Sequence, residues 1–216
     1  MNDNIFLIIM KTNYQKILDE TIAKITESKH KPTLLLHSCC APCSTYVLDY
    51  LSKYFKIIVY YYNPNIYPTE EYFKRVEEQK WFVNIFNKEF NPETKVEFLE
   101  GKYNKEDFYK ISQGLENEPE GGLRCIKCYE LRLNEAAVKA KEIKADYFTT
   151  TLSISPMKNA DALNKIGVKI GEKYNVNYLL SDFKKKEGFK KSVQISNKYN
   201  MYRQEYCGCE FSKIKL

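Results

Sequence analysis

The sequence has 216 residues, and 34 Lys and Arg side chains against 28 Asp and Glu side chains give it a formal net charge of +6. Apolar residues make up 44% and aromatic residues 14%, with only 8 Gly and 7 Pro, so the composition excludes disordered, collagen-like and low-complexity chains. The length suits a single domain with a sizeable core.

The first residues do not have the pattern of a targeting signal. The apolar run at residues 5–10 is short, follows Asp3 where a signal peptide would have a basic segment, and precedes no small-residue cleavage site. No stretch approaches the length of a membrane span, so we expect no membrane partner. We expect a cytoplasmic protein, in which thiols stay reduced.

Strand-like and helical stretches alternate along the chain. In order, the pattern predicts helix 14–25, strand 33–38, strand 56–62, helix 69–90, strand 95–99, helix 129–143, strand 146–152, helix 161–174, strand 177–180 and helix 189–199. Four of the strands are continuous apolar or β-branched runs, which is typical of strands covered on both faces. The helices carry apolar side chains at helical spacing, such as Ile17, Leu18 and Ile22 in the first.

This alternation predicts a parallel sheet with right-handed crossovers. We expect a single three-layer, Rossmann-like (HUP-like) α/β domain over residues 31–216, with a mostly parallel sheet of about five strands. Residues 1–30 would form an N-terminal helical extension. The acidic stretch Gly114–Gly122 is turn-like, and its interpretations as a mobile flap and as an ordinary surface loop both stay open.

Seven cysteines fall in three tight clusters, whereas cysteines that only fill a core would scatter singly. The clusters are Cys39, Cys40 and Cys43; Cys125 and Cys128; and Cys207 and Cys209. In a reducing compartment, clustered thiols more often bind metal or carry out redox chemistry than form structural disulfides.

The first two clusters lie where chemistry is expected in such a fold. His37-Ser38-Cys39-Cys40 begins where the first strand ends, and ligands of open parallel sheets bind beyond the carboxyl ends of the strands. Cys125 and Cys128 open a predicted helix, whose positive dipole end is expected to lower the pKa of their thiols. His37 itself is expected to be a structural group rather than a catalytic one.

The spacing admits two kinds of metal site. Two Cys-x-x-Cys units, Cys40 to Cys43 and Cys125 to Cys128, match the usual signature of zinc. Seven thiols exceed one zinc site, and the adjacent Cys39 and Cys40 suit a polynuclear cluster, so we favour iron–sulfur and keep zinc as the alternative.

The third cluster has a different predicted use. A lone Gly between Cys207 and Cys209 allows a tight and readily reduced ring, which favours a dithiol/disulfide couple. Metal binding by these two thiols stays open as the alternative.

Polar residues follow two further strands. Asn63 and Asn65 come after the second strand, and Ser155, Lys158 and Asn159 come after the fourth, where amides, a hydroxyl and an ammonium could bind a polar or anionic substrate. Ordinary Asn-Pro and Ser-Pro turns are the alternative interpretation.

A basic segment near the end of the sequence points to a nucleic-acid partner. Phe183 and Phe189 are interleaved with its lysines, and Arg203 follows it. The lysines are Lys184, Lys185, Lys186, Lys190 and Lys191. Such a patch favours binding of a phosphate backbone, with a solvated lysine face as the alternative.

Five blocks of this sequence resemble the QueH-type epoxyqueuosine reductases. They run in the family's order and are HSCCAPC (37–43), YNPNIYPTEEYFKR (62–75), RCIKCYELRL (124–133), FTTTLSISPMKN (148–159) and YRQEYCGCEFS (202–212). The resemblance implies a cytoplasmic, iron-dependent oxidoreductase. Such an enzyme reduces the epoxide of epoxyqueuosine at the wobble position of tRNA, the last step of queuosine biosynthesis.

The resemblance also implies site residues. It carries a [4Fe-4S] cluster onto Cys39, Cys40, Cys125 and Cys128, and a redox-active pair onto Cys207 and Cys209. A mononuclear iron beside the cluster belongs to the family, and Cys43, where some members have Asp, is its candidate ligand. The division of the cysteines between cluster and second iron stays open. Residues expected to contact substrate are Asn63, Asn65, Ser155, Lys158, Asn159, Tyr202 and Arg203.

Removing an epoxide oxygen as water takes two electrons and two protons, so the partners expected are tRNA carrying epoxyqueuosine and an external low-potential electron donor. Two other functions remain as alternatives. One is a zinc-stabilised RNA-binding module, and the other is an iron–sulfur electron carrier with no substrate of its own.

Overall fold

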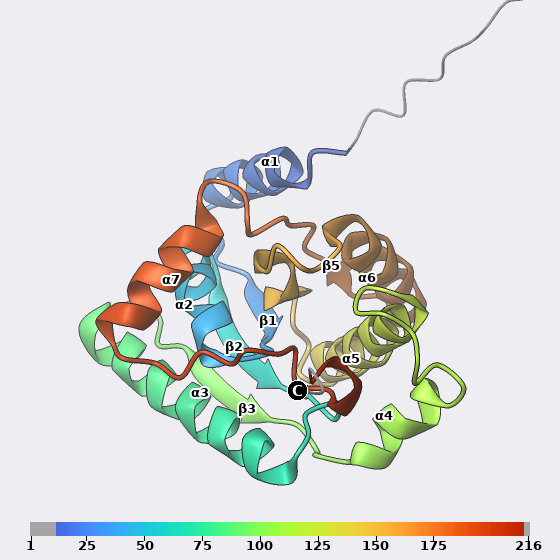
Figure 1. Ribbon diagram of the computed structural model, residues 1–216. Helices are drawn as coiled ribbons and strands as arrows, with labels where there is room; N and C mark the ends of the chain where they lie inside the picture. The colour runs from blue at the N-terminus through green and yellow to red at the C-terminus, as the bar shows by residue number, and fades with distance from the viewer. Residues whose placement is uncertain (1–11, 214–216) are drawn as a thin grey trace, which may run out of the picture.

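A five-stranded sheet forms the middle layer of the molecule (Figure 1). The structure, a computed structural model, describes residues 12–213. The strands are β1 (Thr33–His37), β2 (Lys56–Tyr61), β3 (Glu97–Glu100), β4 (Tyr147–Thr150) and β5 (Asn177–Tyr178). Their order is β3-β2-β1-β4-β5, and every neighbouring pair is parallel. The predicted three-layer, Rossmann-like α/β fold is therefore confirmed.

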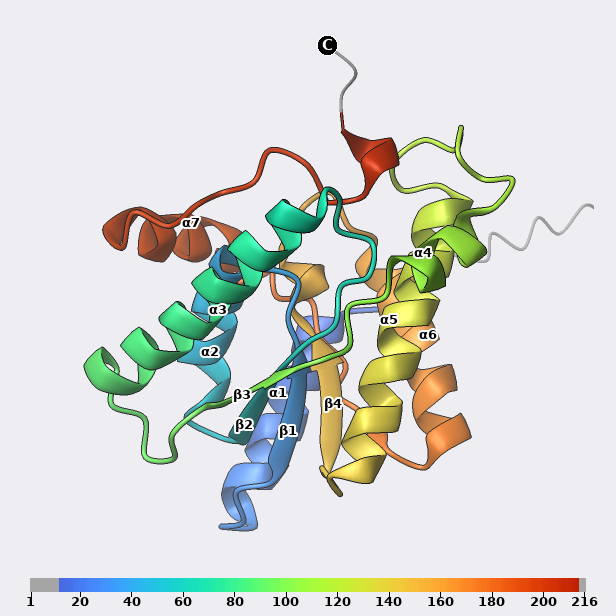
Figure 2. The ribbon, with the colours of Figure 1, turned by 90° about the horizontal axis from the view of Figure 1, so that it is seen from below.

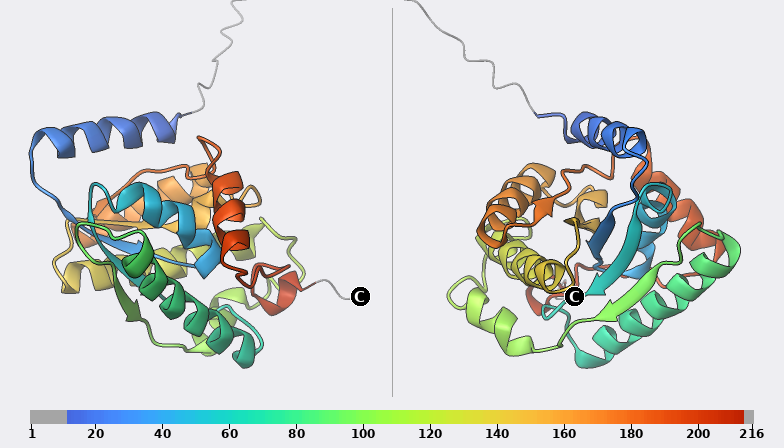
Figure 3. Two further views of the ribbon diagram at one scale, coloured as in Figure 1. Left: turned by 90° about the vertical axis from the view of Figure 1, so that its left-hand side faces the viewer. Right: turned by 180° about the vertical axis from the view of Figure 1, so that it is seen from behind.

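Helices cover both faces of the sheet. They are α1 (Tyr14–Glu27), α2 (Ala41–Leu51), α3 (Thr69–Glu89), α4 (Lys105–Ser112), α5 (Leu123–Glu142), α6 (Ala160–Tyr174) and α7 (Gly188–Lys198). In the right panel of Figure 3, α5 and α6 lie side by side on one side of the sheet, and α2, α3 and α7 lie on the other. None of the helices within residues 12–213 combines the length and the apolar character that crossing a bilayer takes.

The alternation of side chains along β1 builds the two cores. Leu34 and Leu36 point to one face, where they join a cluster with residues of α1, α2 and α3, and Leu35 points to the other, where it joins residues of α5 and α6. All three leucines are fully buried, as expected for a central parallel strand.

Several boundaries differ from the sequence prediction. α2 and α4 were not predicted, and α5 begins at Leu123 rather than at Tyr129. α2 has no polar stripe, because eight of its residues are buried, so it lacks the amphipathic pattern of a surface helix. β4 ends at Thr150, where the chain enters a 3₁₀ turn over Thr151–Ile154.

The acidic stretch Gly114–Gly122 is tied to the start of α5. The Arg124 Nη1 atom donates hydrogen bonds to the carbonyls of Leu115, Glu116 and Glu118. Glu118 in turn accepts from the Leu123 amide. These bonds favour the interpretation of the stretch as an ordered surface loop over that of a flap.

The N-terminal helix contributes to the core. Leu18 and Ile22 of α1 are buried against the first hydrophobic cluster. The boundary at residue 31 stays a prediction, and the apolar run at residues 5–10 lies outside the described residues.

Two glycines let α6 approach β5 closely, and substituting one tests this packing. A Cβ at Gly171 would lie 2.6 Å from the carbonyl oxygen of Val176, which is backbone and cannot turn away. We expect Gly171→Ala to lower the free energy of unfolding by about 1–3 kcal/mol, although alanine is the better helix former. The control Val168→Ala, at an exposed position of the same helix, should change it by less than about 0.5 kcal/mol. Urea denaturation followed by circular dichroism measures both, and equal stability of the two variants would contradict the packing argument.

Candidate active site

Three cysteine thiols converge where β1 ends and α2 begins. The Sγ atoms of Cys39, Cys40 and Cys43, here called the thiol triad, lie within 4.8 Å of one another. Cys40 Sγ is 3.9 Å from Cys39 Sγ and 2.6 Å from Cys43 Sγ. Cys40 is also the N-cap of α2, since its sulfur accepts from the Cys43 amide. The helix start therefore fixes the spacing of the triad.

The electrostatics of the triad favour one thiolate. Hydrogen bonds from the Cys40 and Cys43 thiols and the nearby Arg132 cation lower the pKa of Cys39 well below its usual value. Burial raises the pKa of Cys40. The hydrogen bond between Cys43 and Cys39 raises the pKa of Cys43. Three soft donors held together in a buried setting fit a thiophilic metal such as iron or zinc.

The other two cysteine clusters meet at a neighbouring wall. Cys125 and Cys128, in the first turns of α5, line a narrow cavity together with Cys207 and Cys209. The cavity has a volume of about 10 Å³, room for no more than one water-sized group. Burial raises the pKa of Cys125 and raises that of Cys128 to about 12, so burial outweighs the expected effect of the helix dipole in lowering them.

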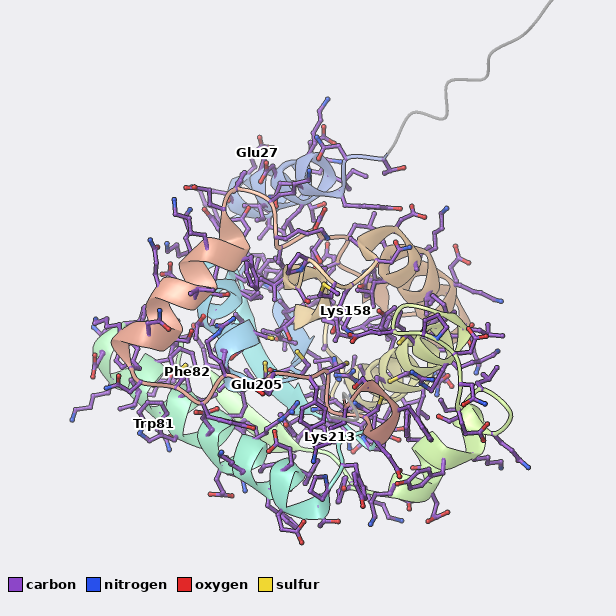
Figure 4. All side chains as sticks on the ribbon, in the orientation of Figure 1. Glu27, Trp81, Phe82, Lys158, Glu205 and Lys213 are labelled. Carbon is purple, nitrogen blue, oxygen red and sulfur yellow. The ribbon has the colours of Figure 1, made fainter. Side chains whose placement is uncertain are left out.

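A much larger cavity, the thiol cavity, opens beside the triad. Its volume is about 510 Å³, which is in the range of small-molecule sites. Cys39 and Cys43 form part of its wall, and Cys207 belongs to the walls of both this cavity and the narrow one. Figure 4 shows sulfur atoms in the middle of the molecule near the labelled Lys158 and Glu205, which also line the thiol cavity.

A buried arginine connects the parts of the site. Arg132 of α5 is 2% exposed, and its Nη2 atom donates to Asn63 Oδ1 at 2.5 Å. Its Nη1 atom lies 4.0 Å from Cys128 Sγ, one helical turn earlier. Arg132 was not among the residues expected from the sequence, although its i, i+4 spacing from Cys128 places both on one face of the helix.

His37 is a satisfied structural group. It is fully buried, its Nδ1 atom lies 2.8 Å from the Thr150 hydroxyl, and its Nε2 atom lies 3.0 Å from the Tyr62 carbonyl oxygen and 3.4 Å from Arg132 Nε. Burial, helped by the Arg132 charge, lowers its pKa to about 3. The imidazole is therefore neutral near pH 7 and ties the ends of β1, β2 and β4 together.

The Cys207-Gly208-Cys209 segment is clamped to α3 and to the loop that follows β2. Arg75 Nη1 donates to the Cys207 carbonyl at 3.4 Å, and the Tyr67 amide donates to the Gly208 carbonyl at 2.8 Å. Gly208 has φ of +119°, and a Cβ there would lie 3.0 Å from Arg75 Nη1. Glycine is therefore required at this position by both conformation and contact. Figure 2 shows the segment crossing one end of the sheet.

The structure separates the residues expected to contact substrate. Ser155, Lys158 and Arg203 line the thiol cavity. Asn65 lines the narrow cavity, where its buried Oδ1 accepts no hydrogen bond from the described residues. Asn159 lines a different cavity and caps α6.

Two of the expected residues line none of these cavities. Asn63 donates to the Ser38 carbonyl and accepts from Arg132, and Tyr202 donates to the Glu71 carboxylate. Wall residues that were not expected from the sequence include Glu120 and Gln204. Glu120 is in ion-pair contact with Lys158 at 2.7 Å.

The basic segment is partly neutralised within the protein. Lys184 pairs with Asp182, Lys186 with Asp19, and Lys190 with Glu187. Asp19 lies far away in the sequence, so this pairing could not be read from the segment itself. Among residues 12–213, Lys185 and Lys191 have no carboxylate within ion-pair distance.

Comparison with known proteins gives one consistent result. The sequence profile of the family described as "Epoxyqueuosine reductase QueH" matches residues 34–215. A relative of that name from Staphylococcus epidermidis is 45% identical over 95% of this chain and 86% of its own length. Relatives of the same name from Streptococcus pyogenes and Thermotoga maritima are 43% and 33% identical, over 94% and 85% of this chain and 78% and 91% of their own lengths.

The role of Arg132 can be tested through metal retention. Arg132→Met removes the cation near Cys39 and Cys128 while keeping most of the volume, and such changes around metal ligands weaken metal binding by roughly 10- to 100-fold. Arg132→Lys should retain more metal because it keeps the charge. Metal content after dialysis against a chelator measures the effect, with Lys127→Met, exposed on the same helix, as the control. Retention of metal by Arg132→Met at the level of the control would contradict this role.

Proposed function

Because this chain belongs to the QueH family of epoxyqueuosine reductases and is thus an oxidoreductase, we propose that it reduces the epoxide of epoxyqueuosine in tRNA to queuosine. The substrate residue is at the wobble position, the reaction takes place in the cytoplasm, and an external low-potential donor supplies the electrons.

The observation that carries the proposal is the position of Cys207. This residue lines the thiol cavity together with Cys39 and Cys43, and it lines the narrow cavity together with Cys125, Cys128 and Cys209. A thiol that lines both cavities lies between the thiols that could bind metal and a space large enough for a modified base. This arrangement suits transfer of electrons to a bound substrate.

The donor set fits a resident iron cofactor. We propose that Cys39, Cys40, Cys125 and Cys128 hold a [4Fe-4S] cluster and that Cys43 holds an adjacent mononuclear iron. When bound, these groups would supply single-electron transfer and Lewis-acid polarisation of the epoxide oxygen. Arg132 supports this assignment, because its buried cation would offset the negative charge that Cys39 and Cys128 carry as thiolate ligands.

We propose Cys207 and Cys209 as the two-electron store. The overall step converts an epoxide and two thiols into an alkene, one water molecule and one disulfide, so that both C–O bonds to the oxygen break and the thiols supply two electrons and two protons. The external donor then reduces the disulfide. All seven cysteines are free thiols in this structure. The clamp formed by Arg75 and Tyr67 holds the pair at the cavity wall.

The chain's polar residues would orient the substrate in the thiol cavity. Lys158 is 7% exposed and is held by Glu120, so its ammonium group keeps a fixed position at the wall. Ser155 and Arg203 supply further hydrogen-bond donors. Asn63 and Tyr202 bond to the Ser38 carbonyl and to Glu71 of α3 and line none of these cavities, so their contact with substrate stays a prediction.

Turnover tests the function directly. The protein, purified without oxygen, is incubated with tRNA carrying epoxyqueuosine and dithionite, and the digested nucleosides are analysed by mass spectrometry. We expect queuosine from the wild type and a rate lower by roughly 100-fold or more for Cys207→Ser and for Cys209→Ser. Glu210→Gln, exposed and next to the pair, is the control and should react at the wild-type rate. No queuosine from a protein with an intact, reducible cluster would leave the electron carrier as the better interpretation.

Metal analysis tests the assignment of the cysteines. Cys125→Ala should lose acid-labile sulfide and the visible absorption of the cluster. Cys43→Ala should keep both and lose about one iron per chain, whereas Cys43→Asp should keep that iron because a carboxylate also binds iron. Zinc without sulfide in the wild type would support the structural-zinc alternative, and loss of sulfide in Cys43→Ala would make Cys43 a cluster ligand.

A further inference from the structure

A second large cavity adjoins the thiol cavity. This outer cavity has a volume of about 940 Å³ and lies between the start of α1, the start of α6 and the turn that precedes α7. Pro156, Lys158 and Phe189 belong to the walls of both cavities. The two spaces therefore adjoin across these residues.

A substrate that is one nucleotide of an RNA chain needs room beyond the reacting base. When the modified base lies in the thiol cavity, the RNA chain continues past the edge of that cavity. The ribose and phosphate of the neighbouring nucleotide must therefore lie outside it. We propose that the outer cavity binds the nucleotide next to the modified one in the tRNA, with its phosphate and ribose inside and its base against Phe189. This inference rests on the proposed function and names how the same site holds its RNA.

The charges of the outer cavity leave one cation available for a phosphate. Lys184 lies 2.7 Å from Asp182, and Asp161 is in ion-pair contact with Lys165, so the carboxylates at the wall are compensated. Lys185 is exposed, and nothing in the described part of the chain forms a hydrogen bond or ion pair with its Nζ atom. Lys185 is therefore the cation that a phosphate would neutralise.

Two helices also begin at this cavity and add to its positive potential. Asn13 caps α1 and Asn159 caps α6, and both caps line the wall. The positive ends of the two helix dipoles favour an anion between them.

Asp182 offers an acceptor for a ribose. It is 8% exposed and lines the cavity, and its Oδ1 atom is held by the Lys184 ammonium at 2.7 Å. Carboxylates commonly accept hydrogen bonds from ribose hydroxyls. The Asp182 carboxylate, which has several acceptor positions, could accept a sugar hydroxyl at the wall while it stays paired with Lys184.

Phe189 supplies the surface for the base. Phe189 is 38% exposed, and the guanidinium carbon of Arg203, which lines the thiol cavity, lies 5.9 Å from the centroid of its ring. An exposed aromatic ring next to a cation is the usual platform on which single-stranded RNA bases stack.

Binding of fluorescein-labelled tRNA carrying epoxyqueuosine tests the proposal across a range of salt concentrations. We expect Lys185→Glu to weaken binding by about tenfold. The slope of log Kd against log salt concentration should fall by about one, which corresponds to one ion pair with phosphate. Phe189→Ala should weaken binding by about fivefold or more with the salt dependence unchanged. Lys169→Glu, exposed on α6 and outside both cavities, carries the same charge change and should bind within about twofold of the wild type.

Cross-linking locates the nucleotide. An anticodon stem-loop with 4-thiouridine beside the modified position is irradiated on the wild-type protein, and the linked peptide is identified by mass spectrometry. A link within residues 156–161 or 182–189 supports the proposal. A link only elsewhere, or Lys185→Glu binding like Lys169→Glu, overturns it while wild-type turnover leaves the proposed function standing. Absence of wild-type turnover would instead overturn the proposed function, and the inference with it.

Discussion

The pairing of β1 with a parallel neighbour on each side is the constraint on which the rest of the structure depends. Its ladders to β2 and β4 bring the carboxyl ends of three strands to one edge. The loops that follow these strands carry the thiol triad, the Asn63–Pro68 turn and the segment leading to Lys158. His37 secures this edge, because it bonds to residues at the ends of both neighbouring strands. The site is thus a consequence of strand order rather than of any single motif.

Buried arginines organise the loops above that edge. Arg75, Arg124 and Arg132 are among the largest fully buried side chains of the described residues. Each serves a different segment: Arg75 the cysteine pair near the end of the sequence, Arg124 the acidic loop, and Arg132 the thiols and Asn63. A buried guanidinium group is costly unless it is hydrogen-bonded or near negative charge, so these residues also suit a site that gathers thiolates.

The sheet could be predicted from the sequence because apolar runs are local. The three cysteine clusters could be singled out as site residues because their spacing is local as well. The sequence did not predict α2, in which eight of eleven residues are buried, so that the helix lacks the polar stripe typical of a surface helix. It also overestimated the free charge of the basic segment, because Lys186 is paired with Asp19, a residue brought close only by folding. Raised thiol pKa values at Cys125 and Cys128 likewise depend on burial, which spacing does not reveal.

The segment with Arg203, Gln204 and Cys207 forms one wall of the thiol cavity, yet every strand of the sheet precedes it in the sequence. None of the strand pairings involves this wall, so a local opening of residues 203–207 would leave the sheet intact. With the wall docked, a metal has to pass it to reach Cys39 and Cys43, whereas a local opening would expose both thiols without unfolding the sheet.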